Sequence, residues 1–403
     1  MNSENQNKNF GMLKKLIFGR SKKLTCIKYM GKLFGNKGYI ADDECDDYYA
    51  VEIDPGSDNT KSIEQLWKDH KVKMTTLFES NIPEVPIRKL HGCDYLIVKK
   101  ILYEISEKIL HSTHVTDKVE LQFINGASHG GYIYCQKGEY DGGFTSYDIN
   151  SEYPSIMKTK KFKFPIKGGR PELISQDKID RKQIGIYKIK ITSTVDPAKF
   201  KKFSDGYDYY TNYDLKDLHR LKYTYEIDMK SEYNAFLYND DDCVTGKELF
   251  GEYIDILYEI KLNKYKNIKK VLNMLWGEAC SSKKTKVPIE QMNRYKPEDF
   301  ISFNHETDTL YLRDSEQPYN WTFCRMKPFL LSSGRSKIGK IAFVIQEDGY
   351  KVIKIHTDSI LTNCKPDEME NYFDLDNQIG HLKVEKTYKS KFKIVHCNKT
   401  EII

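Results

Sequence analysis

Two short acidic motifs, far apart in the sequence, constrain this chain more than any other feature. The first is Y-D-I-N-S-E-Y-P-S-I at residues 147–156, and the second is I-H-T-D-S-I at residues 355–360. In each motif an aspartate, Asp148 or Asp358, follows an apolar, β-branched run and precedes small polar residues, which is typical of a strand end. Two carboxylates that separate strands bring together can hold a pair of Mg²⁺ ions. Such a pair activates a hydroxyl nucleophile and neutralises the charge that builds on a phosphate.

A lysine-rich helical pattern lies between the two motifs, at residues 250–279. Lys269, Asn273 and Trp276 stand at positions i, i+4 and i+7, so they share one face of the predicted helix. A lysine there could neutralise a triphosphate and its leaving group. The alternative is a solvated lysine face with Trp276 in the core, and this is our interpretation for Lys264 and Lys266.

In their order and their letters, the three motifs resemble those of family B DNA polymerases, most closely the protein-primed viral and plasmid branch. The family's first palm motif, D-x-x-S-L-Y-P-S, is D-I-N-S-E-Y-P-S here. Its helix motif, a lysine, three residues, an asparagine and then tyrosine-glycine, is K-K-V-L-N-M-L-W-G. Its last palm motif, D-T-D-S, is H-T-D-S. The resemblance covers about residues 125–400.

The resemblance implies an α+β fold with a right-hand palm, in which an antiparallel sheet is packed with helices. Helical fingers and a short N-terminal α/β domain complete it. The implied function is that of a DNA-directed DNA polymerase, which transfers dNTPs to a primer 3′-OH with two Mg²⁺ ions or with Mn²⁺. A catalytically impaired, polymerase-like DNA-binding protein or replication accessory subunit is the alternative. The implied partners are template-primer DNA and dNTPs, with a terminal protein or a thumb or processivity partner left open.

The resemblance also implies roles for individual residues. Asp148 and Asp358 are the expected catalytic and metal-binding carboxylates, and the carbonyl of Ile149 is a further expected metal ligand. Tyr153 is the expected steric gate against a ribose 2′-OH. The expected nucleotide-binding residues are Ser151, Glu152, Tyr153, Lys261, Lys269, Asn273 and Trp276. The expected DNA-binding residues are Ser128, Gly130, Gly131, Thr357 and Lys399, with Lys383 and Lys386 as alternatives to Lys399 for the primer contact.

Glu152 and His356 depart from the family pattern, and two of the motifs have alternative interpretations. Glu152 replaces a leucine, but the triphosphate contact expected there uses backbone N–H groups. His356 stands where the family usually has a carboxylate, and imidazole prefers softer ions than Mg²⁺. We therefore expect the two-metal site to persist with an altered metal preference or rate. An alternative for D-x-N-S is an Asx turn that caps a helix beginning near Pro154. The Gly130-Gly131 pair could likewise be a simple turn.

The expected domain organisation has three parts. Residues 1–50 form a basic and then acidic extension, and residues 51–125 form a reduced N-terminal domain, exonuclease-like or divergent. Residues 126–403 form the palm and fingers, with fingers at about 250–282 and no thumb. A 3′–5′ exonuclease needs an early metal-binding D-x-E, and before residue 126 its letters fit only Asp42-Asp43-Glu44, in an acidic cluster. We therefore expect no proofreading.

Composition limits the remaining choices. The net charge is +6, from 64 basic and 58 acidic residues, so a polyanion partner would depend on local clusters of charge. The nine cysteines form no C-x-x-C pair and indicate reduced, intracellular thiols. No apolar run has the length of a membrane span, so we expect no membrane partner. We expect an intracellular site of viral or plasmid replication, in host cytoplasm or nucleus, with a mitochondrial site left open.

Local patterns predict several elements. Helices are expected at 95–110, 213–225 (with a turn) and 328–346, and the 250–279 helix should break at Asn263 or Asn267. Strands are expected at 146–149, 186–194 and 350–355, and a hairpin at 300–303 and 309–312.

Overall fold

The computed structural model describes residues 93–192, 206–262, 268–295, 300–304, 307–314 and 316–403. It also describes two short paired strands, β1 (Lys37–Ala41) and β2 (Tyr48–Glu52). The chain divides into two compact units, Met1–Ile105 with Asp255–Leu275, and Ser106–Ile254 with Trp276–Ile403. Four predictions lie outside the described residues: the basic N-terminal segment, the acidic cluster with Asp42-Asp43-Glu44, the solvated lysines Lys264 and Lys266, and the break near Asn263 or Asn267.

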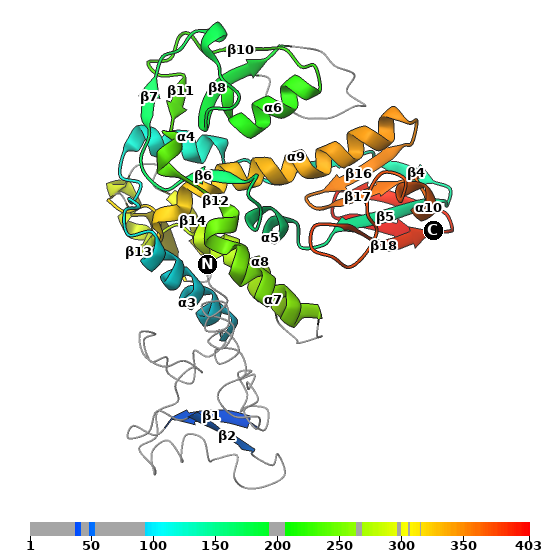
Figure 1. The fold of residues 1–403 in the computed structure, drawn as a ribbon, viewed down its shortest axis with the longest axis horizontal. Helices are drawn as coiled ribbons and strands as arrows, with labels where there is room; N and C mark the ends of the chain where they lie inside the picture. The colour runs from blue at the N-terminus through cyan, green and yellow to red at the C-terminus, as the bar shows by residue number, and fades with distance from the viewer. Residues whose placement is uncertain are drawn as a thin grey trace. The chain divides into compact units, whose positions relative to one another are not determined.

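A five-stranded antiparallel sheet in the second unit corresponds to the predicted palm (Figure 1), and we call it the palm sheet. Its strands, in spatial order, are β18 (Leu382–Tyr388), β5 (Phe144–Ile149), β17 (Ser359–Thr362), β16 (Val352–His356) and β3 (Ile133–Cys135). Tyr147 and Ile149 of β5 are buried, and Asp148 between them faces the other side, as a period of two requires. The strand β5 therefore presents an acid on the face opposite its apolar core.

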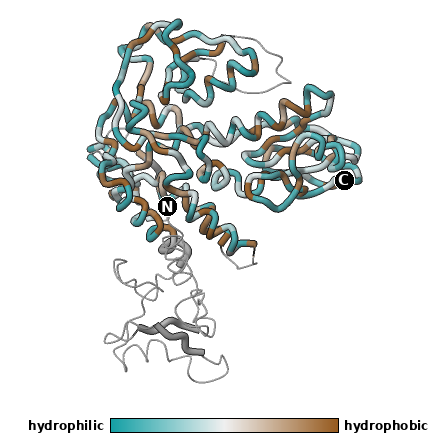
Figure 2. The backbone as a smooth tube through the Cα atoms, viewed as in Figure 1, coloured by the Kyte–Doolittle hydropathy of each residue, from teal (hydrophilic) through white to brown (hydrophobic). Residues whose placement is uncertain are grey.

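The long helix α9 (Met326–Glu347) supports the palm sheet. Ile338, Ile341, Ala342 and Ile345 recur at helical spacing and pack in one core with the buried residues of β5, β16 and β17. Figure 2 shows apolar and hydrophilic residues alternating along this helix. The helix also contacts α4 (Lys118–Ala127), α5 (Glu152–Met157) and α6 (Asn212–Arg220). It thus connects the palm sheet to the rest of the second unit.

A second sheet has the order β10-β8-β11-β7, with β9 pairing β8. Its strands are β7 (Arg170–Glu172), β8 (Gly185–Ile191), β9 (Asp208–Thr211), β10 (Tyr225–Ile227) and β11 (Ala235–Leu237). Helix α6 follows β9 directly because Thr211 and Asp214 form a capping box at its N-terminus. Leu215 and Leu218 of α6 complete the core of this sheet.

Three smaller sheets complete the second unit. They are β6 (Lys163–Pro165) with β12 (Cys243–Thr245); β13 (Lys284–Pro288), β15 (Thr309–Arg313) and β14 (Phe300–Asn304); and β20 (Lys399–Ile402), β19 (Phe392–His396) and β4 (Gly138–Tyr140). The helices α3 (Cys93–Lys108), α7 (Glu252–Leu262) and α8 (Ile268–Ala279) each contain residues of both units. The short helix α10 (Pro366–Met369) adds Met369 to the core of the palm sheet.

Most element predictions agree with this fold. The helix predicted at 328–346 is α9, and the predicted hairpin is β14 and β15, which gain a third strand, β13, on the other side of β15. The strand predicted at 186–194 ends at Ile191 in β8, and residues 193–194 lie outside the described part. In the described part of the chain, no helix is long and apolar enough to span a bilayer.

Candidate active site

The two predicted aspartates meet at one end of the palm sheet. Asp148 is the penultimate residue of β5, and its neighbours across the sheet are Ser359 on β17 and Lys383 on β18. The Ile149 N–H donates to the carbonyl of Asp358 at 2.8 Å, so the turn between β16 and β17 is attached to the end of β5. Thr357, in that turn, has a left-handed φ of 57°. Strand pairing therefore brings two acids that are distant in the sequence to one place.

The two acids have different electrostatic surroundings. Burial, followed by the negative charge of Asp148, raises the pKa of Asp358, while His356 and Lys383 oppose that rise. The Lys383 ammonium lies 2.7 Å from Oδ2 of Asp148. Lys383 was predicted only as an alternative primer contact, so its position beside the acid pair is a finding of the structure. A cation bound here would relieve the repulsion between the two carboxylates.

The donor set suits Mg²⁺ or Mn²⁺. Carboxylate and carbonyl oxygens are hard ligands, and Mg²⁺ is usually bound by one or two carboxylates, with water and substrate phosphates completing its shell. Among the described residues, no three His, Cys, Asp or Glu side chains form a ready-made metal cage. Asp148, Asp358 and the predicted carbonyl of Ile149 fit a site that substrate completes better than a closed structural site.

The residues after Asp148 form a tight turn into α5. Ser151 is left-handed, with φ 52° and ψ 57°, and makes no side-chain capping bond. The Asn150 side-chain amide donates to the Asn377 carbonyl at 2.7 Å, away from the start of the helix. The helix α5 begins at Glu152, two residues before Pro154, and its N-cap residue is Ser151. The turn is held from the side by the loop at Asn377.

Tyr153, the expected steric gate, is held between two neighbours. Its ring centroid lies 4.7 Å from that of Trp276. On α9, a Cβ built at Gly334 would lie 2.9 Å from a ring carbon of Tyr153, so glycine is required for this approach. Trp276 is half-buried, so it does not lie fully in the core. Gly334 has no sequence motif and was not predicted.

The sequence-based expectation for Glu152 concerned only its backbone N–H group, whereas the structure shows an unusual position for its side chain. Its side chain is 2% exposed, and neither carboxylate oxygen has a hydrogen-bond partner among the described residues. Burial, then the charges of Asp358 and Asp148, raise its pKa well above the usual value, against the charge of Lys337. Lys337, on α9, donates to Ser155 Oγ at 2.9 Å. The chain therefore buries a third acid beside the predicted pair.

The predicted template-contacting turn at 128–131 lies beside the second acidic motif. A Cβ at Gly131 would lie 2.7 Å from the Thr357 side chain, so two of the predicted DNA-binding residues are neighbours. Ser128 uses its hydroxyl to donate to the Ile124 carbonyl at 2.6 Å, within its own helix end. Space around Gly130 is open.

Arg335 on α9 holds this turn, and sequence reasoning missed it. Its guanidinium donates to the carbonyls of His129 and Gly130 at 3.0 and 3.1 Å and pairs with Asp214 at 2.9 Å. A basic residue within a helical pattern carries no signal for such a role. Arg335 thus joins the turn at His129 and Gly130 to α9, and its pair with Asp214 joins α9 to α6.

The remaining predicted residues belong to other elements of the chain. Lys269 and Asn273 are exposed on α8, and the Lys261 ammonium lies 4.7 Å from the Tyr258 ring centre on α7; all four belong to the first unit. Lys399 begins β20 and pairs with Glu401 at 2.6 Å.

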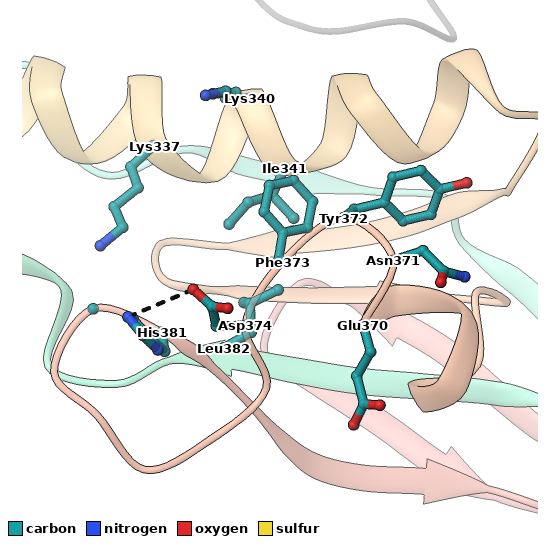
Figure 3. A pocket seen from close by; sticks show the side chains of 11 residues that line it. Lys337, Lys340, Ile341, Glu370, Asn371, Tyr372, Phe373, Asp374, His381 and Leu382 are labelled. Carbon is teal, nitrogen blue, oxygen red and sulfur yellow. Dashed lines mark ion pairs between the residues drawn. The ribbon is translucent and has the colours of Figure 1, made fainter.

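A cavity of about 500 Å³ lies between α9 and the loop at residues 370–382 (Figure 3). Lys337 and Lys340 of the helix line it, and Lys337 extends toward the loop. His381 and Asp374, 3.8 Å apart, face them from the loop. Its lining mixes both signs of charge, so it lacks a clear preference for an anion or a cation.

The antiparallel sheet with a long helix on one face is the palm of a polymerase-type fold. Two structures of phi29 DNA polymerase share it. The complex with primer-template DNA and incoming nucleotides has a TM-score of 0.52 at 20% identity, covering 75% of this chain and 54% of that one. The post-translocation complex with primer-template DNA has a TM-score of 0.53 at 18% identity, covering 93% and 69%. At these identities the likeness concerns the fold, and this chain spans about half of the polymerase in the first complex.

The sequence matches the family of type B DNA polymerases, organellar and viral, over residues 58–323. Because that match covers more than half of the chain, the chain belongs to this family. Comparison with curated proteins gave no match.

Proposed function

We propose that this chain is a DNA-directed DNA polymerase that adds dNTPs to a primer 3′-OH on a template. The observation that supports this most is the meeting of Asp148, on β5, with Asp358, in the turn that leads into the neighbouring strand β17. The hydrogen bond from the Ile149 N–H to the Asp358 carbonyl joins the two segments. Family membership supports the same reaction.

Divalent cations, when bound, would activate the 3′-OH and stabilise charge on the transferred phosphoryl group. In the proposal, Asp148 and Asp358 hold those cations with the carbonyl of Ile149. The N–H groups of Ser151, Glu152 and Tyr153 bind the triphosphate, and the Tyr153 ring excludes a 2′-OH.

Charged and backbone groups outside the acid pair hold the remaining substrate parts in this proposal. Lys269, with Lys261, neutralises the triphosphate, and Asn273 and Trp276 border the new base pair. The turn with Gly131 contacts the template, and Lys399 contacts the primer. We further propose that the chain lacks 3′–5′ exonuclease activity. A terminal protein or a processivity partner is the proposed protein partner.

Primer extension by the purified chain tests the main proposal. Asp148→Asn and Asp358→Asn should each reduce extension at least about 10³-fold in Mg²⁺ or Mn²⁺, because the cations lose a charged ligand. Asp367→Asn, at an exposed acid on α10, is the matched control and should extend normally. Normal extension by either active-site variant, with folding confirmed by circular dichroism, would refute the mechanism.

The position of Lys383 favours a second candidate, a DNA-binding protein without synthesis. Its ammonium already neutralises Asp148, at the place where a cation would bind. If so, the chain should bind primer-template DNA but extend it with neither cation, and Lys383→Met should restore extension. If the chain is an active polymerase, Lys383→Met should instead lower the Mg²⁺ concentration that gives half-maximal extension.

A further inference from the structure

Two cysteines that are distant in the sequence lie side by side at the edge of the palm sheet. The Sγ atoms of Cys135 and Cys397, separated by 262 positions, are 2.9 Å apart. A disulfide bond has an S–S distance of about 2.05 Å. The two sulfurs therefore need to approach each other by less than about one ångström to form one.

The surrounding backbone already holds the two segments together. Cys135 ends β3 and lies opposite Lys354 of β16, and Cys397 lies in the turn between β19 and β20. The Lys354 ammonium is 3.4 Å from Thr400 Oγ1 in β20, and the Gln136 N–H donates to the Ile353 carbonyl at 2.8 Å. Bond formation thus needs rotation of side chains rather than movement of strands.

Partial exposure together with proximity to a second thiol distinguishes this pair from the other cysteines whose side chains the structure describes. Cys135 and Cys397 are both partly exposed, whereas Cys280, Cys324 and Cys364 are buried. Cys243 is also partly exposed, but its thiol donates to the Asn239 carbonyl. A small soluble oxidant can therefore reach the pair, and the two thiols can react with each other.

We propose that Cys135 and Cys397 are an oxidisable pair whose disulfide joins the sheet of β20, β19 and β4 to the edge strand β3 of the palm sheet. The oxidant is a low-molecular-weight disulfide. One protein thiolate attacks it, forming a mixed disulfide and releasing one small thiol. The second protein thiolate attacks the mixed disulfide, forming the Cys135–Cys397 bond and releasing the second small thiol. Two protein thiols are oxidised, one external disulfide is reduced, and the two protons pass to the released thiols.

The bond would restrain the end of the chain that carries Lys399, two residues after Cys397. A cross-link between such distant positions restricts the unfolded chain strongly, so it should stabilise the folded state. The expected signature is a rise of several degrees in the melting temperature of the oxidised protein, reversed by dithiothreitol. This inference concerns the fold and holds whether or not the chain synthesises DNA.

The experiment treats the full chain with oxidised glutathione and maps its disulfides by peptide mass spectrometry without reduction. The wild type and Cys243→Ser should both yield a peptide that joins residues 135 and 397, and both should show the rise in melting temperature. Cys135→Ser and Cys397→Ser should melt like the wild type under reducing conditions but show no such rise on oxidation.

Three outcomes would overturn the proposal. One is a stable mixed disulfide with glutathione at either position, which would mean that the second thiol cannot reach the first. Another is a link between two chains that increases with protein concentration. The third is a wild-type chain that keeps both thiols free after treatment.

Discussion

At the scale of single residues, the role proposed for Tyr153 is selection of the sugar of the incoming nucleotide. The Tyr153 ring packs against Trp276 and lies close to the backbone of α9 at Gly334. Tyr153→Ala should raise the incorporation of ribonucleotides relative to deoxynucleotides by at least about tenfold. Removing a steric penalty of ~1.4 kcal/mol from the activation free energy already changes a rate tenfold. Tyr153→Phe keeps the ring and should discriminate as the wild type does. Single-nucleotide extension with rNTP and dNTP measures the ratio, and an unchanged ratio in the alanine variant would assign the gate to another residue.

Glu152 makes stability depend on pH. Burial and the charge of Asp358 raise its pKa in the folded state, so the folded protein holds this proton more tightly than the unfolded chain. Its contribution to stability is therefore fully present below the unfolded pKa and is lost as pH rises through the folded pKa. Glu152→Gln should increase the free energy of unfolding at pH 8 by about 1–3 kcal/mol, and the gain should fade toward pH 4.

Urea unfolding at both pH values, with a chelator to remove cations, measures this difference. Glu139→Gln is the control, since Lys391 lowers the pKa of that exposed carboxyl. Its substitution should show no gain at pH 8. An equal effect of Glu152→Gln at both pH values would mean that Glu152 is uncharged throughout.

At the scale of elements, a buried ion pair joins α4 to the start of α9. Arg325 and Glu120 are 1% and 2% exposed, with Nε to Oε1 at 2.6 Å and Nη2 to Oε2 at 2.9 Å. The same guanidinium donates to the carbonyls of Thr113 and His114. Charge-assisted, two-point bonds of this kind hold two helices in one arrangement.

Removing one partner should leave the other charged and buried. Arg325→Met should lower the free energy of unfolding by about 3–5 kcal/mol in urea titration. Adding Glu120→Leu to that variant should recover most of the loss, because no uncompensated charge remains. Losses that simply add in the double variant would show that the two side chains do not depend on each other.

At the scale of the whole molecule, a net charge of +6 spread over 64 basic and 58 acidic residues gives only a weak overall field. Binding of DNA should then depend on local phosphate contacts, with log K falling linearly as log salt rises. Lys399→Ala should reduce that slope by about one unit if Lys399 contacts a primer phosphate. Lys178→Ala, at an exposed lysine of the short helix Gln176–Lys178, should leave it unchanged. Fluorescence anisotropy over a salt series measures both, and equal slopes would exclude the Lys399 contact.

The sequence by itself determined the elements and the two acids. Local periodicity is sufficient to place α9 and the strand that ends at Asp148, because burial of one face imposes that period on neighbouring residues. The order of three short motifs likewise predicted the palm, since each motif depends on a few adjacent residues.

Only the tertiary structure decided which distant side chains meet. Lys383 reaches Asp148 through strand register, Gly334 admits the Tyr153 ring through helix packing, and Cys135 meets Cys397 through the junction of two sheets. None of these contacts has a local pattern. They follow from how whole elements pack, and a single-residue shift in register would turn each strand's side chains to the opposite face.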